Sequence, residues 1–241
     1  MNDTVSIARR FCGPTGSANG GYICGLVAAL ARESVTVRLL KPPPLETTLV
    51  VEYTNGLPRV RHGADVVAET RPGTVESLAP PTRPTHADAV AASRNYTGFA
   101  AHPAPRCFVC GPKRKPGDAL CIFPGIVAPG VVAAPWVPHA SLDLGDGAAR
   151  PELMWAALDC PGYIAVAPDM RSMLLGELTA DIRRRASIGE TCTVVGWKIA
   201  SSGRKYEAGT AVIGADGETI ATARAIWIEP RPSSPSTTPT T

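Results

Sequence analysis

Asp159 stands in the segment Leu158-Asp159-Cys160-Pro161-Gly162, where helix-forming residues give way to a proline and a glycine. A carboxylate at the start of a helix can act as a general base or as a nucleophile, and partial burial tunes its pKa toward neutrality. The same carboxylate can instead cap the helix by accepting backbone N–H bonds. Both roles are open, and Asp159 is the leading catalytic candidate.

The segment Asn19-Gly20-Gly21-Tyr22 provides a companion to that carboxylate. Two glycines at a helix N-terminus expose backbone N–H groups, and these donors can stabilise a developing oxyanion. We therefore expect Asn19 in a catalytic role and Gly20, Gly21 and Tyr22 against the substrate. The alternative is a tight turn with close packing. Gly162 and Tyr163 occupy the equivalent place in the second half and are expected to bind substrate too.

Cys107-x-x-Cys110 has the spacing of half a zinc site. Tetrahedral zinc needs two further ligands, and the sequence offers Cys121 and His102 but no second Cys-x-x-Cys. We interpret the motif as a structured turn and expect no metal. The chain also lacks the Gly-x-Ser-x-Gly of serine hydrolases and a Rossmann glycine pattern.

Composition excludes several other classes of protein. The 241 residues are 44% hydrophobic and only 5% aromatic, and the net charge is +3, so nucleic-acid binding is not expected. No stretch of about 18 apolar residues predicts a membrane span. Seven scattered cysteines, an odd number, are typical of reduced thiols. These features predict a cytoplasmic protein with no membrane partner.

A repeated phrase organises the chain. Gly21-Tyr22-Ile23 recurs as Gly162-Tyr163-Ile164, and Glu46-Thr47 is matched later by Glu190-Thr191 in the same order. Ordered matches at a slowly drifting offset indicate two copies of one unit.

Each copy is predicted to be a helix followed by antiparallel strands. The helices are expected within 16–33 and from 151 through 166, with a break at 160–162. Strands are expected at 35–39, 45–53, 59–70, 131–137, 177–184, 191–200, 205–214 and 219–229. The predicted units are 1–70, a proline-rich connector at 71–106, a second unit at 107–229 and a disordered tail at 230–241.

These residues resemble the double-hotdog proteins of the acyl-CoA thioesterase superfamily. The resemblance lies in Gly16–Tyr22, in His102-Pro103 leading into Cys107–Pro112, and in Trp155–Gly162. It implies an α+β double hotdog, in which two curved antiparallel sheets each wrap a central helix. Two independent α+β domains are the alternative.

The resemblance also implies a function: hydrolysis of an acyl-CoA or acyl-carrier thioester by Asp159. Thr179 and Glu177 would then position water; the alternative is an ordinary strand threonine and a solvent-facing glutamate. Coenzyme A would enter only as part of the substrate, with no separate cofactor. The basic runs 113–115 and 183–185 either contact its phosphates or form a solvated face. Many hotdog enzymes have a histidine where this chain has Asn19. The alternative therefore stays open that the protein is not catalytic and binds acyl-CoA or another small ligand. The oligomeric state also stays open, from one chain to a homodimer or larger homo-oligomer.

Overall fold

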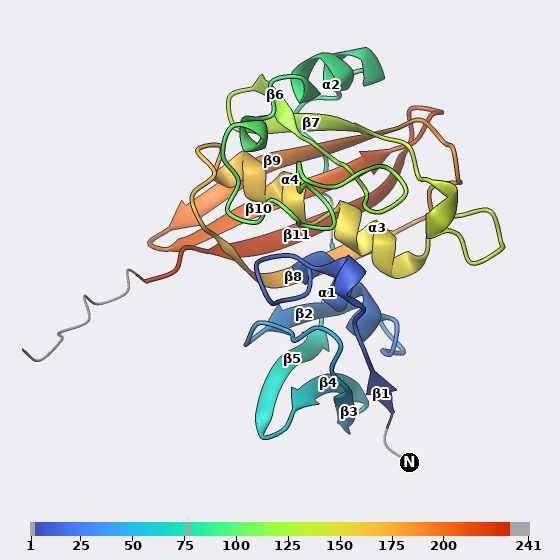
Figure 1. Ribbon diagram of the computed structural model, residues 1–241, viewed down its shortest axis with the longest axis vertical. Helices are drawn as coiled ribbons and strands as arrows, with labels where there is room; N and C mark the ends of the chain where they lie inside the picture. Colours follow the sequence, from blue (N-terminus) through green and yellow to red (C-terminus); the bar gives the residue numbers. More distant parts are fainter. Residues whose placement is uncertain (1–2, 76–77, 232–241) are drawn as a thin grey trace, which may run out of the picture.

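The computed structural model describes residues 3–75 and 78–231, which build one antiparallel sheet with helices against it (Figure 1). Along the sheet the strands follow the order β1-β3-β4-β5-β2-β8-β11-β10-β9-β7-β6. The strands are β1 Thr4–Val5, β2 Val35–Leu39, β3 Leu49–Thr54, β4 Leu57–His62, β5 Asp65–Pro72, β6 Gly125–Ala128, β7 Val131–Trp136, β8 Leu174–Ile182, β9 Cys192–Ser202, β10 Lys205–Ile213 and β11 Thr219–Ile228. The helices are α1 Gly20–Ala28, α2 His86–Ser93, α3 Pro151–Ala157 and α4 Cys160–Val166.

The unit of a helix followed by antiparallel strands occurs twice, as the sequence repeat predicts. α1 precedes β2 to β5, and α3 with α4 precedes β8 to β11. The two sets of strands are not separate sheets, because β2 pairs with β8 and places Val37 opposite Leu178. One continuous sheet therefore carries both helical layers.

The segment expected as a connector has structure of its own. It contains α2, which begins at a complete capping box formed by Thr85 and Asp88 and lies against β6 and β7 (Figure 1). Of the expected disordered tail, residues 232–241 lie outside the described residues.

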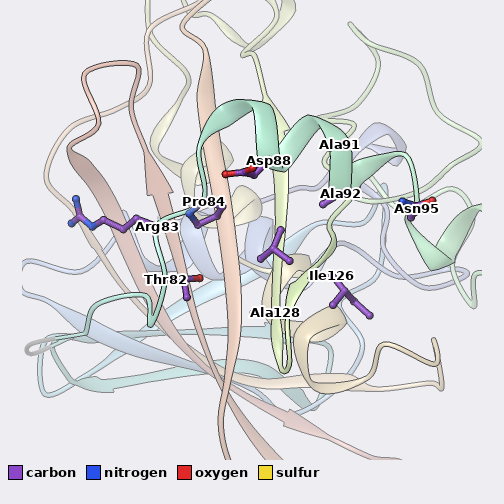
Figure 2. Close-up of a pocket in the computed structure, with 10 residues that line it drawn as sticks. Thr82, Arg83, Pro84, Asp88, Ala91, Ala92, Asn95, Ile126 and Ala128 are labelled. Atoms are coloured by element: carbon purple, nitrogen blue, oxygen red, sulfur yellow. The ribbon is translucent and has the colours of Figure 1, made fainter.

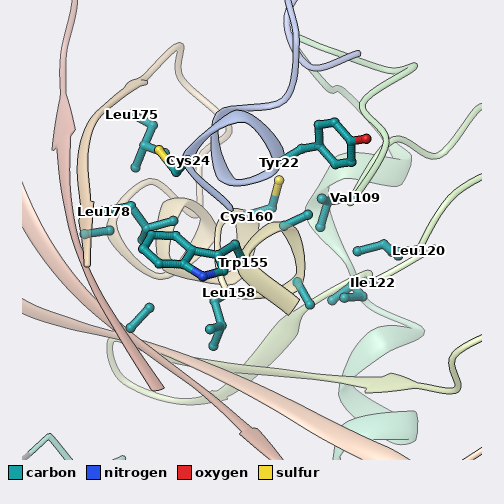
Figure 3. Packing of buried hydrophobic residues seen from close by; sticks show 14 of the residues in the cluster. Tyr22, Cys24, Val109, Leu120, Ile122, Trp155, Leu158, Cys160, Leu175 and Leu178 are labelled. Atoms are coloured by element: carbon teal, nitrogen blue, oxygen red, sulfur yellow. The ribbon is translucent and has the colours of Figure 1, made fainter. Parts of the chain in front are cut away.

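Side chains from both halves form the main core. Alternate residues of a strand face opposite sides of the sheet, and Val194 joins the main core while Val195 joins a small second cluster on the other face. Trp155 and Leu158 pack beside Cys24 of α1 and Leu178 of β8 (Figure 3). The two helical layers thus share one core.

The first helix lies within the predicted range 16–33 and begins directly after Asn19. Asn19 caps it by accepting the N–H of Tyr22 (2.9 Å). The preceding residues are held in extended bridges, Ser17 to Pro44 and Ala18 to Cys12. These bridges prevent the helix from starting at residue 16.

The second helix is broken into α3 and α4, as predicted, but the break lies at 158–159 and not at 160–162, which form the first turn of α4. Pro161 has no N–H and its ring obstructs the carbonyl four residues earlier, so a continuous helix cannot pass through it. The break places Asp159 between the two helices, with backbone angles φ −82° and ψ −77°. Within the described part of the chain, no helix combines the length and apolar character needed to cross a bilayer.

Candidate functional site

Asp159 is buried, with 2% of its surface exposed, and its carboxylate is bound by the opposite half of the chain. Oδ2 accepts hydrogen bonds from Asn19 Nδ2 (2.7 Å) and from the N–H of Gly21 (2.9 Å). The side chain makes no capping bond to its own helix α4. Oδ1 is buried and has no partner among the described residues. The carboxylate thus links the two halves instead of capping α4.

Burial decides the electrostatics of this carboxylate. Desolvation raises the pKa of Asp159 to about 7, because the charged form loses its water. The hydrogen bonds from Gly21 and Asn19 favour the charged form but offset only part of that effect, and the nearby Cys107 opposes them.

Asp159 lines a cavity of about 420 Å³ between the two halves. It is lined by the loop before α1, the segment after β2, residues of the segment 102–110, the start of α4, and parts of β8 and β11. The lining is mainly apolar and includes Leu39, Tyr163, Met173, Leu175 and Trp227. Such a cavity, with few polar groups, is typical of a small-molecule site.

The first turn of α1 has four N–H groups that no helical carbonyl in the preceding turn can accept. Of these groups, the N–H of Asn19 bonds to the carbonyl of Phe11 (2.8 Å), that of Gly21 to Asp159 and that of Tyr22 to Asn19 Oδ1. Gly20 lines the cavity, and its N–H has no partner among the described residues. Of the expected oxyanion donors on α1, Gly20 is therefore the one that remains available.

Of the other residues expected to bind substrate, Tyr163 lies at the cavity, whereas Tyr22 and Gly162 do not. Tyr163 lines the cavity and donates its hydroxyl to the carbonyl of Arg171 (2.9 Å). Tyr22 is stacked on Phe11, with ring centroids 4.0 Å apart, and Gly162 faces β10; neither is among the residues that line the cavity.

Thr179 and Glu177 are not brought to Asp159. The hydroxyl of Thr179 forms a hydrogen bond with that of Thr36 (2.7 Å) across the junction between β2 and β8. Glu177 forms an ion pair with Arg71 at the same junction. Because strand pairing directs both side chains to partners in β2 and β5, neither lines the cavity.

The arginines of the two basic runs are engaged within the molecule. Arg114 bonds to Asp118 and to the carbonyl of Arg10. Arg184 pairs with Glu190 and Asp216. These contacts are structural, and neither run lines the cavity.

A cluster of three thiols that was not predicted from the sequence lies beside Asp159. Cys160 joins Cys107 and Cys110, and their three Sγ atoms all lie within 4.8 Å of one another. Hydrogen bonds from the other two thiols hold the pKa of Cys107 well below its ordinary value. Cys121 is not part of the group. The repeat aligns Cys160 with the start of α1, but no local signal in the sequence connects Cys160 to the Cys107-x-x-Cys110 motif about fifty residues earlier.

A second hollow lies between the segment leading into α2 and strand β6 (Figure 2). Its one carboxylate, Asp88, bonds to the backbone and hydroxyl of Thr85 at the start of α2. The cavity at Asp159 is therefore the stronger candidate site.

Comparisons with solved structures agree with the fold. The tesB protein of Mycobacterium avium subspecies paratuberculosis matches 95% of this chain and 92% of its own, at 13% identity and a TM-score of 0.58. A thioesterase superfamily protein matches 52% of this chain and 61% of its own chain, at 17% identity and a TM-score of 0.47. The PaaI protein of the E. coli phenylacetic acid degradation operon matches 46% of this chain and 84% of its own chain, at 14% identity and a TM-score of 0.42.

No model of a protein family matches the chain, and no curated protein is similar to it in sequence. The match to the tesB protein over nearly the full length supports the predicted double-hotdog fold.

Proposed function

We propose that this protein hydrolyses an acyl thioester in the cavity between its two halves, with Asp159 as the general base. One observation carries the proposal: Asp159 lines that cavity, and its Oδ1 is buried without a partner among the described residues. A buried polar atom without a partner is costly, and a bound water or substrate would supply one.

The arrangement supports a simple reaction. Asp159 takes a proton from water, and the resulting hydroxide attacks the thioester carbonyl carbon. The N–H of Gly20 donates to the oxygen of the tetrahedral intermediate. The carbon–sulfur bond then breaks, and the thiolate leaves with the proton that Asp159 returns. The products are a carboxylic acid and a thiol.

Asn19 positions the base in this scheme. Together with the N–H of Gly21 it holds Oδ2, which leaves Oδ1 for the water. This arrangement replaces the histidine that many hotdog enzymes have at this place. The apolar walls of the cavity suit an acyl chain, and a thioester of coenzyme A or of acyl carrier protein fits the proposal equally well.

The test is hydrolysis of a panel of acyl-CoAs by the wild type and by Asp159→Asn. The amide has the same shape but cannot accept the proton, so we expect a loss of about 100-fold or more. The rate should be followed by thioester absorbance, because a thiol reagent would also react with the protein's own cysteines. Asp181→Asn, on the exposed part of β8, is the matched control and should retain the wild-type rate.

Two results would contradict the proposal. Equal rates for wild type and Asp159→Asn would remove Asp159 from the mechanism. Saturable binding of acyl-CoAs without hydrolysis by the wild type would instead favour the non-catalytic binding protein.

A further inference from the structure

Cys107, Cys110 and Cys160 bring three thiols together from two distant segments. Cys107 and Cys110 lie in the loop that follows the connector, and Cys160 is the first residue of α4. All three are buried, and each lines the cavity. Figure 3 shows Cys160 between α1 and the segment that carries Val109 and Leu120.

The separation of the sulfur atoms suits a metal ion. Cys107 Sγ and Cys160 Sγ are 3.7 Å apart. Two thiolates bound to one tetrahedral zinc at a Zn–S distance of about 2.3 Å are separated by about 3.8 Å. Cys110 completes a triangle whose sides are all within 4.8 Å, so small side-chain movements would bring the three atoms onto one ion.

The backbone around Cys107 and Cys110 is held in place without an ion. The N–H of Gly111 bonds to the carbonyl of Cys107 (3.0 Å), and a Cβ at Gly111 would lie 2.5 Å from the nitrogen of Cys107. The N–H of Leu120 bonds to Phe108 (2.9 Å), and that of Ile122 to Val109 (2.9 Å). This tight turn directs both thiols toward the start of α4.

Neighbouring donors would support thiolates at this place. His102 Nε2 lies 3.3 Å from Cys110 Sγ, and its Nδ1 accepts the N–H of Ala104 (2.9 Å). In the neutral imidazole an accepting Nδ1 leaves the proton on Nε2, which therefore donates to sulfur. Asn19 Nδ2 lies 3.8 Å from Cys107 Sγ and 4.0 Å from Cys160 Sγ. Such outer donors orient metal ligands.

We propose that Cys107, Cys110 and Cys160 bind one zinc ion per chain, with the fourth coordination position directed into the cavity. His102 acts as a donor to Cys110 and not as the fourth ligand. Soft thiolates select zinc and other thiophilic metals over magnesium or calcium, and binding displaces the protons of the three thiols. The inference goes beyond thioester hydrolysis and does not depend on it.

The first experiment measures metal in the full chain, purified with a reductant and without chelators. We expect about one zinc per chain. Cys160→Ser should reduce this to less than a tenth, because two thiolates hold zinc far more weakly than three. Cys192→Ser is the matched control: Cys192 is equally buried in β9 but lies outside the cluster, so this variant should keep its zinc.

The second experiment needs no variant and covers the case in which Cys160→Ser does not fold. Metal-free, reduced wild type is titrated with Co²⁺, and we expect thiolate-to-cobalt charge-transfer absorption that saturates at about one equivalent and is displaced by zinc.

Three outcomes would overturn the proposal: no zinc together with no charge-transfer band, another metal in place of zinc, or a Cys107–Cys160 disulfide in the reduced preparation. None of these measurements uses thioester hydrolysis, so failure of the metal site and failure of the proposed activity are distinguishable.

Discussion

Asn19 has two structural roles, one as a hydrogen-bond acceptor and one as a hydrogen-bond donor. Its Oδ1 accepts the N–H of Tyr22 at the start of α1, and its Nδ2 donates to Asp159. An amide can do both because it carries an acceptor and a donor, whereas an aspartate at this place would set two carboxylates against each other.

Substitution of Asn19 separates these two roles. Ser caps helices about as well as Asn, so Asn19→Ser should lose only the contact to Asp159, while Asn19→Ala should lose the cap as well. We expect Asn19→Ala to be less stable than Asn19→Ser by about 1 kcal/mol in urea unfolding. Equal stabilities would show that the cap contributes nothing.

Glu190 is a second residue whose environment has a measurable consequence. It accepts two hydrogen bonds from Arg184 (2.8 and 2.9 Å), and the N–H groups of Ser187 and Ala215 also donate to it. The bonds from Arg184 are the main reason that the pKa of Glu190 is lowered to about 2.

A carboxyl group whose pKa is lower in the folded than in the unfolded protein stabilises the fold fully only at pH values where it is ionised in both states. The contribution is therefore complete above about pH 4.5 and is lost as the pH falls toward 2. Glu190→Gln should be less stable than wild type by about 1 kcal/mol at pH 7, since the half-exposed Arg184 is screened by solvent. Denaturation at a series of pH values should show that difference disappearing near pH 2; a constant difference would contradict the assignment.

At the scale of elements, the crossing of α1 over α3 depends on two glycines one turn apart. A Cβ at Gly21 would lie 2.6 Å from the carbonyl oxygen of Trp155, and a Cβ at Gly25 would lie 2.6 Å from the Cα of Glu152. The two helix backbones therefore touch, and this approach brings the N–H of Gly21 to Asp159.

Gly25→Ala tests this crossing. Alanine improves helix propensity by up to about 1 kcal/mol, but pressing a methyl group against backbone costs about 1–3 kcal/mol. We expect a net loss of stability in thermal or urea unfolding. Gly20→Ala is the control, because its Cβ would meet the flexible end of Leu175 (2.8 Å) and should change stability less. A Gly25→Ala protein more stable than wild type would refute the close approach.

At the scale of the whole molecule, the two halves are joined through the pairing of β2 with β8. Thr36 and Thr179 lie opposite each other there, both buried, and share a hydrogen bond. Either hydroxyl is left without this partner when the other is removed.

A double-mutant cycle tests the junction. Thr179→Val alone should cost about 1–3 kcal/mol, because it leaves the Thr36 hydroxyl buried and unsatisfied. Thr36→Val combined with Thr179→Val should recover much of that loss, since no polar group is then stranded. Additive losses in chemical denaturation would mean that the two hydroxyls do not interact.

The sequence by itself determined the fold and most of the elements. The repeated Gly-Tyr-Ile phrase predicted two units of a helix and strands, and the strands expected at 205–214 and 219–229 correspond to β10 and β11. These predictions succeed because periodicity and turn chemistry are local properties of the chain. Asp159 was singled out for a similar reason, since the proline after it marks a helix break.

Only the tertiary structure decided which groups meet at the candidate site. It directed Thr179 to Thr36, used the N–H of Gly21 on Asp159 while leaving that of Gly20, and brought Cys160 to Cys107. The first outcome depends on the pairing of β2 with β8, the second on the close packing of α1 on α3, and the third on how the loop of Cys107 reaches the start of α4. No local pattern encodes such contacts, because the partners are 53 to 143 residues apart.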